Sequence, residues 1–181
     1  MPFRITAAAA VVALVIVAAT GCTSPPSPTS TPTPTFTSAD QAYAAAEKTY
    51  RAYVDALNEV DLRDPKTFEA VYAWTTGDAL EGDKKSFTSM HADGWHVSGE
   101  TVLGRIRPVA FELSGHTRVT ARVCLDVSRV KVVDLDGDSV VPNGRNDRQP
   151  VTVTFTDGSS RTGLLIATSD ASTDGEICGG H

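Results

Sequence analysis

The chain has 181 residues, of which 41% are hydrophobic and 21% are charged. These values are near the averages for soluble globular proteins, so they exclude a wholly disordered chain and a polytopic membrane protein. The formal net charge is −6, which repels phosphate backbones, and we expect no nucleic-acid partner. About 140 residues follow the N-terminal segments described next, which is the usual size of one domain.

The first 22 residues have the organisation of a bacterial export signal. A basic start at Arg4 is followed by an apolar run over residues 5–19, which is too short for a comfortable membrane span. The run ends in the letters ATGC at residues 19–22, which resemble the lipobox of bacterial lipoproteins. We therefore expect residues 1–21 to be a signal peptide and Cys22 to carry lipid, including palmitate. The alternative is an ordinary secretory signal with a chance cysteine.

A tether is predicted directly after the lipid site. Residues 22–37 consist almost wholly of Ser, Thr and Pro after Cys22, and such a segment cannot bury enough apolar area to fold. Proline extends it to about 3 Å per residue, so it could hold a domain some 40 Å from the bilayer. We expect a single domain over residues 38–181, anchored on the extracytoplasmic face of the cell membrane.

Two cysteines remain if Cys22 carries lipid, namely Cys124 and Cys178. An exported domain with one pair of cysteines most simply forms one disulfide, and two free thiols are the alternative. Cys124 alternates with apolar neighbours, so it should point away from the apolar face of its strand. Cys178 should then bring the C-terminal tail across the outer side of the sheet.

Three helices are predicted before any strand. Residues 38–41 read as a capping box, and the apolar residues behind them recur at three- and four-residue steps as far as Val60. Asp64 and Pro65 predict the start of a second helix that ends at Gly77. A third helix is expected from Asp78 to Gly94, with its apolar side turned inward.

After Trp95 the apolar period changes from helical to two, which indicates half-buried antiparallel strands. The first alternating run contains Val109, and the second covers residues 119–127. The apolar phase then shifts near Ser128 and Arg129, which predicts a bulge that bends one long strand. Residues 151–166 read as a closing hairpin.

Helices followed by a curved meander indicate an α+β domain, with three N-terminal helices packed in the concave face of a curved antiparallel sheet. This order resembles the cone-shaped nuclear transport factor 2-like fold, which ketosteroid isomerases, dehydratases and many non-enzymatic domains share. The segments TTGDALEGDKKSFTSMHADGW (75–95) and VCLDVSRVKVVDLDGDSVV (123–141) resemble uncharacterised actinobacterial lipoproteins with Ser/Thr/Pro tethers. That resemblance implies a fold and a location, and no assigned activity.

The polar motifs do not predict a catalytic residue, a metal site or a cofactor. The alternating carboxylates of DLDGDS (134–139) look like a calcium loop, but the glycine is misplaced and Arg145 stands where a glutamate is required. A hairpin turn at this glycine is the better interpretation. His91 and His96 lack a third metal ligand, and no nucleophile-elbow pattern accompanies them.

The fold resemblance implies a candidate pocket in the mouth of the cone. Ketosteroid isomerases hold an acidic base and hydroxyl donors there. Residues of this sequence that could supply such groups, or aromatic side chains lining the pocket, are Tyr50, Trp74, Trp95, His96 and Asp126. Aromatic residues at helical spacing are also typical of a plain core.

We expect a non-catalytic domain that binds a small apolar ligand or an envelope protein, besides the membrane contact through lipid on Cys22. The alternative is a small-molecule isomerase or dehydratase. A buried acid with a perturbed titration in an open cavity would discriminate the two.

Overall fold

The computed structural model describes residues 36–113 and 115–179. The predicted signal peptide, the lipidation at Cys22 and nearly all of the tether lie outside the described residues. The elements are, in chain order, α1 (Ala39–Asn58), η1 (Pro65–Phe68), α2 (Glu69–Tyr72), α3 (Gly77–Ala92), β1 (His96–Ser98), β2 (Val102–Leu113), β3 (Thr117–Asp126), β4 (Lys131–Val133), β5 (Arg148–Asp157), β6 (Leu164–Ala171) and η2 (Gly175–Cys178).

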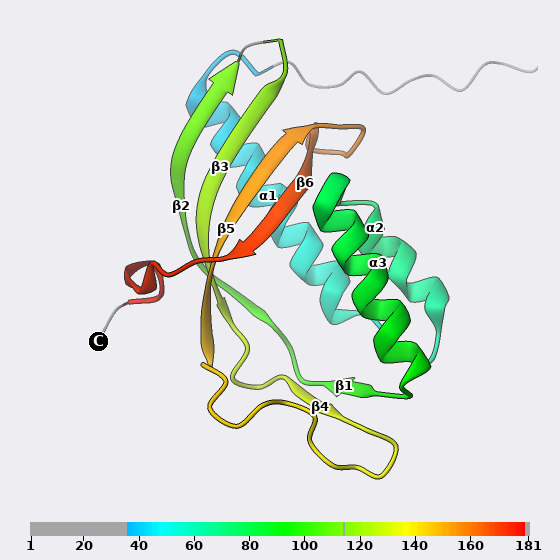
Figure 1. The fold of residues 1–181 in the computed structure, drawn as a ribbon. Helices are drawn as coiled ribbons and strands as arrows, with labels where there is room; N and C mark the ends of the chain where they lie inside the picture. Colours follow the sequence, from blue (N-terminus) through cyan, green and yellow to red (C-terminus); the bar gives the residue numbers. More distant parts are fainter. Residues whose placement is uncertain (1–35, 114, 180–181) are drawn as a thin grey trace, which may run out of the picture. The chain divides into compact units, whose positions relative to one another are not determined.

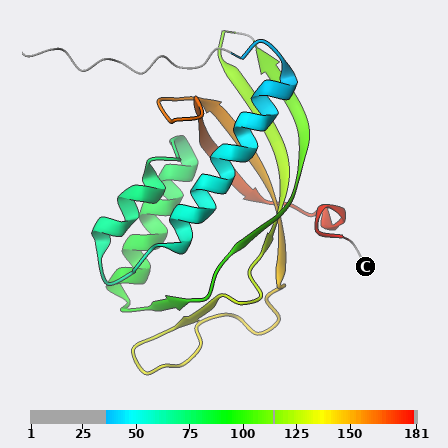
Figure 2. The ribbon, with the colours of Figure 1, turned by 180° about the vertical axis from the view of Figure 1, so that it is seen from behind.

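The domain consists of a four-stranded antiparallel sheet in the order β2-β3-β5-β6, a small β1-β4 sheet, and a layer of helices. Helix α1 crosses the concave face of the larger sheet, and α2 and α3 lie on the same side beside it (Figure 1, Figure 2). The predicted α+β architecture, with three helical segments packed against a curved antiparallel sheet, is confirmed. Among residues 36–113 and 115–179, no helix combines the length and apolar character of a membrane span.

The main core lies between α1 and the sheet. From α1, Tyr50 and Val54 are buried, and they meet the inward residues of the central strands, including Val123 and Phe155. The rings of Tyr50 and Phe155 pack edge to face with centroids 6.3 Å apart. A second cluster around Phe68 and Phe87 joins α1 to α2 and α3. Most of the aromatic side chains on the helices therefore belong to the two cores.

The start of α1 confirms the predicted cap. The Ser38 hydroxyl accepts a hydrogen bond from the Gln41 backbone N–H at 3.3 Å. The Gln41 side chain in turn accepts from the Thr37 N–H at 3.2 Å, one residue before the expected partner. Both bonds satisfy N–H groups that the helix itself cannot pair.

The predicted second helix was wrong in its length. The helical segment that starts at Pro65 stops at Tyr72, and Gly77 begins α3 instead of ending α2. The intervening residues leave the helix because they dock on the sheet: the Ile166 N–H donates to the Trp74 carbonyl at 2.9 Å, and the Thr76 N–H donates to the Ile166 carbonyl at 2.8 Å. This docking occupies the edge of β6 at Ile166.

The end of α3 is built as predicted around Gly94. Its φ of +70° is in the left-handed region, which glycine tolerates best. The Gly94 N–H donates to the His91 carbonyl, and the Trp95 N–H donates to the Met90 carbonyl. This pair of bonds is a Schellman motif, and it turns the chain from α3 into β1.

The strand alternation is confirmed in β3, where Val119, Ala121 and Val123 are buried on the side of α1. It fails partly in β2, where Val109 is 49% exposed. The pairing of β2 with β3 shifts register between Pro108 and Ala110, so Val109 is the extra residue of a bulge and loses its inward position.

The predicted long bent strand is also wrong. Residues 127–130 form a turn closed by a hydrogen bond from the Val130 N–H to the Val127 carbonyl at 3.0 Å. After this turn β4 pairs with β1 in the second sheet. The Arg145 guanidinium donates to both the Val127 and the Val130 carbonyls at 2.9 Å, so two polar acceptors of the turn are satisfied by one side chain.

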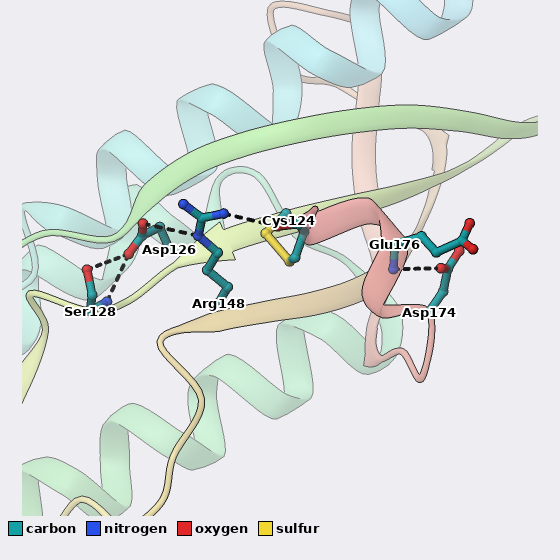
Figure 3. Close-up of a disulfide and its surroundings, with 7 residues drawn as sticks. Cys124, Asp126, Ser128, Arg148, Asp174 and Glu176 are labelled. Carbon is teal, nitrogen blue, oxygen red and sulfur yellow. Dashed lines mark hydrogen bonds and ion pairs between the residues drawn. A yellow bond between two sulfur atoms is a disulfide. The ribbon is translucent and has the colours of Figure 1, made fainter. Parts of the chain in front are cut away.

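The C-terminal tail lies on the outer face of the sheet, opposite α1 (Figure 1, Figure 2). Cys124 and Cys178 form the predicted disulfide, with their Cα atoms 5.1 Å apart (Figure 3). Arg122 pairs with Asp174 of the tail at 2.6 Å, and the Arg148 guanidinium donates to the Cys178 carbonyl at 3.1 Å. The Ser172 N–H donates to the Pro150 carbonyl of β5 at 2.9 Å, and Ile177 of η2 is buried. The tail is therefore held by a covalent bond, several polar contacts and a buried apolar side chain.

We predict that removing the disulfide lowers the free energy of unfolding by about 4 kcal/mol, because the bond closes a loop of about 55 residues in the unfolded chain. The variant Cys124→Ser/Cys178→Ser avoids a free thiol. Urea denaturation with and without reductant measures the effect, and the double variant should no longer respond to reductant. A wild-type chain whose midpoint is insensitive to reductant would contradict the prediction.

Candidate functional site

The five residues of the predicted pocket do not line one cavity in the described residues. Tyr50 is 1% exposed and belongs to the main core. Trp74 is buried as well, and the Arg161 guanidinium lies 5.1 Å from its ring centroid. Trp95 packs at the margin of the second core, while His96 is exposed on β1.

Asp126 stands apart from the other four, at the end of β3. Its carboxylate accepts from the Ser128 hydroxyl at 2.6 Å and from the Ser128 N–H at 3.0 Å, and it lies 3.9 Å from the Arg148 guanidinium (Figure 3). The Ser128 bonds, followed by the Arg148 charge, lower the pKa of Asp126. These contacts give Asp126 a structural role, in which it fixes the end of β3 near the disulfide.

The polar motifs weighed in the sequence have structural roles. His91 contacts the Leu62 carbonyl through Nδ1 at 2.6 Å and so links α3 to the loop after α1. In the DLDGDS segment, Asp134 accepts from the backbone N–H groups of Asp136 and Asp138, which is the expected hairpin turn. Within the part of the chain described here, no three His, Cys, Asp or Glu side chains are grouped so as to hold a metal.

A polar cavity of about 290 Å³ lies between α3 and β6, beside Tyr53 of α1. The inward positions of α3 follow one another at helical spacing, so Ala79, Asp83 and Ser86 face the same space. The lining residues are Tyr53, Thr75, Asp78, Ala79, Gly82, Asp83, Ser86, Ile166, Thr168, Ser169 and Asp170.

Asp83 is the central ionisable group of this cavity. One of its carboxylate oxygens, Oδ1, accepts a hydrogen bond from the Tyr53 hydroxyl at 3.2 Å. The other, Oδ2, is buried and has no hydrogen-bond partner in the described residues. Burial raises the pKa of Asp83 to about 6, although the Tyr53 and Thr75 hydroxyls oppose the rise. Burial, followed by the negative charge of Asp83, also raises the pKa of Tyr53.

Thr75 supplies a second buried polar atom to the same cavity. It is 3% exposed because the residues on either side of it are hydrogen-bonded to Ile166 at the edge of β6. Its hydroxyl oxygen has no well-aligned hydrogen-bond partner in the described residues, but the hydroxyl interacts with the Asp83 carboxylate and opposes the rise of its pKa. The Thr75 hydroxyl and the Asp83 carboxylate are therefore two buried polar groups that interact weakly with each other.

The charge of the cavity is uniformly negative. Its lining includes Asp78, Asp83 and Asp170 and no Lys, Arg or His. Two basic side chains are held over aromatic rings outside the cavity lining. The Lys84 ammonium lies 5.4 Å from the Tyr72 ring centroid, and the Arg161 guanidinium lies over the Trp74 ring. The cavity consequently favours a cation or a hydrogen-bond donor and disfavours an anion.

An apolar groove of about 170 Å³ lies on another side of α3. It is formed by α1, α3 and the small β1-β4 sheet, and most of its lining comes from Leu57, Val60, Leu62, Phe87, Met90, Val97, Val130 and Val132. This groove has the apolar character that the sequence analysis expected of a pocket, although none of the five predicted residues lines it.

Sequence reasoning missed Asp83 and Thr75. A signal for Asp83 was present, because it stands midway between Ala79 and the buried Phe87 at four-residue steps, which places a carboxylate on an inward helix face. For Thr75 no such signal existed, since its burial results from pairing with a strand 91 positions later.

Comparisons with known proteins support the fold and do not assign the chain to a family. No family model matches the chain, and no curated protein matches it. The intermembrane space region of the chloroplast protein ARC6 is 16% identical, with a TM-score of 0.50 over 76% of this chain and 98% of that one. The periplasmic domain of DotI is 14% identical, with a TM-score of 0.50 over 76% of this chain and 97% of that one.

These matches correct one expectation. The assignment to a family of actinobacterial lipoproteins was wrong, because the similar structures are an organellar and a periplasmic domain outside such a family. The fold part of the resemblance holds: the chain has the nuclear transport factor 2-like α+β fold.

The titration of Asp83 predicts how stability depends on pH. Its pKa of about 6 in the fold exceeds the ordinary value of 3.8, so between these values the folded chain keeps a proton that the unfolded chain has lost. Stability should therefore fall as pH rises from about 4 to about 6. We expect Asp83→Asn to remove this dependence and to gain about 1 kcal/mol at neutral pH, allowing for solvent screening.

Chemical denaturation at a series of pH values measures the effect. Glu81→Gln is the matched control, because Glu81 is an exposed acid on α3 outside the cavity. The Asp83 interpretation fails if both variants change the pH profile equally.

Proposed function

We propose that this chain is an exported lipoprotein, anchored through Cys22 on the extracytoplasmic face of a membrane, whose domain binds an envelope component without catalysis. Residues 1–21 would be the signal peptide, residues 22–37 the tether, and residues 38–181 the binding domain. The anchoring part of the proposal comes from the sequence of the export segment and its lipobox.

The observation that carries the proposal is the disulfide between Cys124 and Cys178. Disulfides persist in oxidising compartments and are rare in reducing ones, so the bond agrees with export independently of the N-terminal sequence. It also fixes the tail across the outer face of the sheet, which leaves the helix side of the domain for other contacts.

The folds of similar domains give further support. The DotI domain is periplasmic, and the ARC6 region belongs to an intermembrane space. We propose that this domain likewise works in an envelope compartment and that its partner is another envelope protein. The apolar groove around Phe87 and Met90 is the surface we propose for that contact, or for a small apolar ligand in its place.

Binding is favoured over catalysis by the charge of the Asp83 cavity. An isomerase or dehydratase of this fold would develop negative charge on a substrate oxygen, and donors must stabilise that charge. Here the exposed Asp78 and Asp170 line the same cavity as Asp83, and the Tyr53 hydroxyl is already bonded to Asp83 itself. An oxyanion in this cavity would therefore face carboxylates.

The isomerase or dehydratase remains the second candidate because one observation favours it. Asp83 is a largely buried acid with a raised pKa, and it lies beside an open cavity. Such an acid near neutrality is what general acid–base catalysis requires. A direct assay of turnover separates the two candidates.

Lipidation is tested at Cys22. We expect Cys22→Ala to abolish incorporation of labelled palmitate and to change the fate of the chain, which is either released from the membrane or left unprocessed in it. Ser24→Ala, two residues away in the tether, should leave labelling and fractionation unchanged. Undiminished labelling of the Cys22 variant would refute the anchor.

Catalysis is tested with the purified full chain and steroid-like or polyketide-like carbonyl substrates. We expect no turnover above the uncatalysed rate, and no difference between the wild type and Asp83→Asn. Absorbance of the conjugated product is the measurement. Steady turnover that disappears in Asp83→Asn and persists in Glu81→Gln would establish the enzyme in place of the binding domain.

A further inference from the structure

We propose that Asn143 is a site of spontaneous deamidation, and that the modified residue loosens the turn between β3 and β4. Water is the only co-reactant that the reaction needs. The site lies in the loop between β4 and β5, outside both the Asp83 cavity and the apolar groove. The proposal goes beyond the binding role and does not rest on the lipid anchor.

Asn143 stands in an exposed turn and is followed directly by Gly144. The Arg145 N–H closes this turn by donating to the Pro142 carbonyl at 3.2 Å. Gly144 has a φ of +87°, in the left-handed region that glycine tolerates best. Its own N–H makes no backbone hydrogen bond in the described residues, and no atom lies within 4 Å of the place that a Cβ on it would take. The Gly144 nitrogen is therefore unhindered.

That nitrogen can attack the side-chain amide carbon of Asn143. A bond forms between the Gly144 nitrogen and Cγ, the bond from Cγ to Nδ2 breaks, and the amide leaves as ammonia with the proton of the Gly144 nitrogen. Water then opens the cyclic imide. Cleavage at Cγ gives aspartate, and cleavage at the main-chain carbonyl gives isoaspartate, whose backbone is lengthened by Cβ. A side chain on the following residue hinders ring closure, and glycine has none.

The chain contains two other asparagines, and each lacks one of these conditions. The Asn58 side chain is held, because it donates to the Thr101 carbonyl and accepts from the Thr101 N–H, both at 2.9 Å. Asn146 is exposed in the same loop as Asn143, but the side chain of Asp147 follows it. Asn146 is therefore an internal control for the effect of the following residue.

The modification acts on the turn between β3 and β4 through Arg145. The Arg145 guanidinium donates to the Val127 and Val130 carbonyls at 2.9 Å. Aspartate at position 143 adds a negative charge two residues away, which competes for the guanidinium. Isoaspartate also displaces the backbone that carries Arg145. Both products weaken the two bonds, and because Val130 lines the apolar groove, the change reaches that surface.

The site is tested by incubating the purified full chain in mild detergent at mildly alkaline pH and mapping its peptides by mass spectrometry. Trypsin releases residues 132–145, in which Asn143 is the sole asparagine. We expect Asn143 to convert at least about tenfold faster than Asn146 or Asn58, as a barrier lower by about 1.4 kcal/mol gives. Asn143→Gln should abolish conversion of this peptide, because the longer side chain closes a ring less readily, and Asn146→Gln should leave it unchanged. Equal rates at Asn143 and Asn146 would overturn the proposal.

Hydrogen exchange of fresh and incubated chains tests the effect on the turn. The Val130 N–H, which donates to the Val127 carbonyl at 3.0 Å, should exchange at least about threefold faster after conversion, because exchange reports local opening. Fresh Asn143→Asp and Arg145→Gln should show the same direction of change, and incubated Asn143→Gln should show none. Unchanged exchange at Val130 in the converted chain would overturn the loosening. Neither failure alters the Cys22 labelling result, so the two proposals fail separately.

Discussion

The packing of α1 across the concave face of the sheet is the constraint on which the other features depend. Tyr50 and Val54 pack against the concave face of the sheet. Register shifts lie between β2 and β3 and between β5 and β6, and such bulges bend a strand. Once α1 is seated, Tyr53 on its flank faces α3, so the same helix that builds the core also presents a hydroxyl to Asp83. Helix α1 therefore contributes side chains to both the main core and the polar cavity.

The environment of a carboxylate, more than its residue type, decides its behaviour in this domain. Asp126 is half-buried and receives two hydrogen bonds from Ser128, which lower its pKa. Asp83 lies in a more buried environment, and burial raises its pKa although the Tyr53 and Thr75 hydroxyls oppose the rise. A folded domain gains nothing in stability from such a buried acid, and polar groups kept at a stability cost are common at functional sites.

Local patterns predicted the helices, the inward residues of β3 and the disulfide, because caps, alternation and a single cysteine pair are read from adjacent residues. They failed where tertiary pairing decides. The segment after Tyr72 left its helix to pair with Ile166, and β4 paired with β1 in place of extending β3. The pocket residues chosen by chemical type were dispersed, since Tyr50 and Trp74 are buried in packing contacts. Asp83 was missed although its spacing from Ala79 and Phe87 places it on an inward face of α3.

The docking of residues 74–76 on β6 also bears on how copies of this domain can meet. A free sheet edge is a template for pairing with another chain. Here one edge is occupied by the chain's own backbone through Ile166. The opposite edge, β2, has two register shifts and contains Pro108, which interrupt the regular row of donors and acceptors, and Arg105 and Arg107 place positive charge along it. Copies crowded side by side would thus be kept from joining their sheets into a continuous assembly.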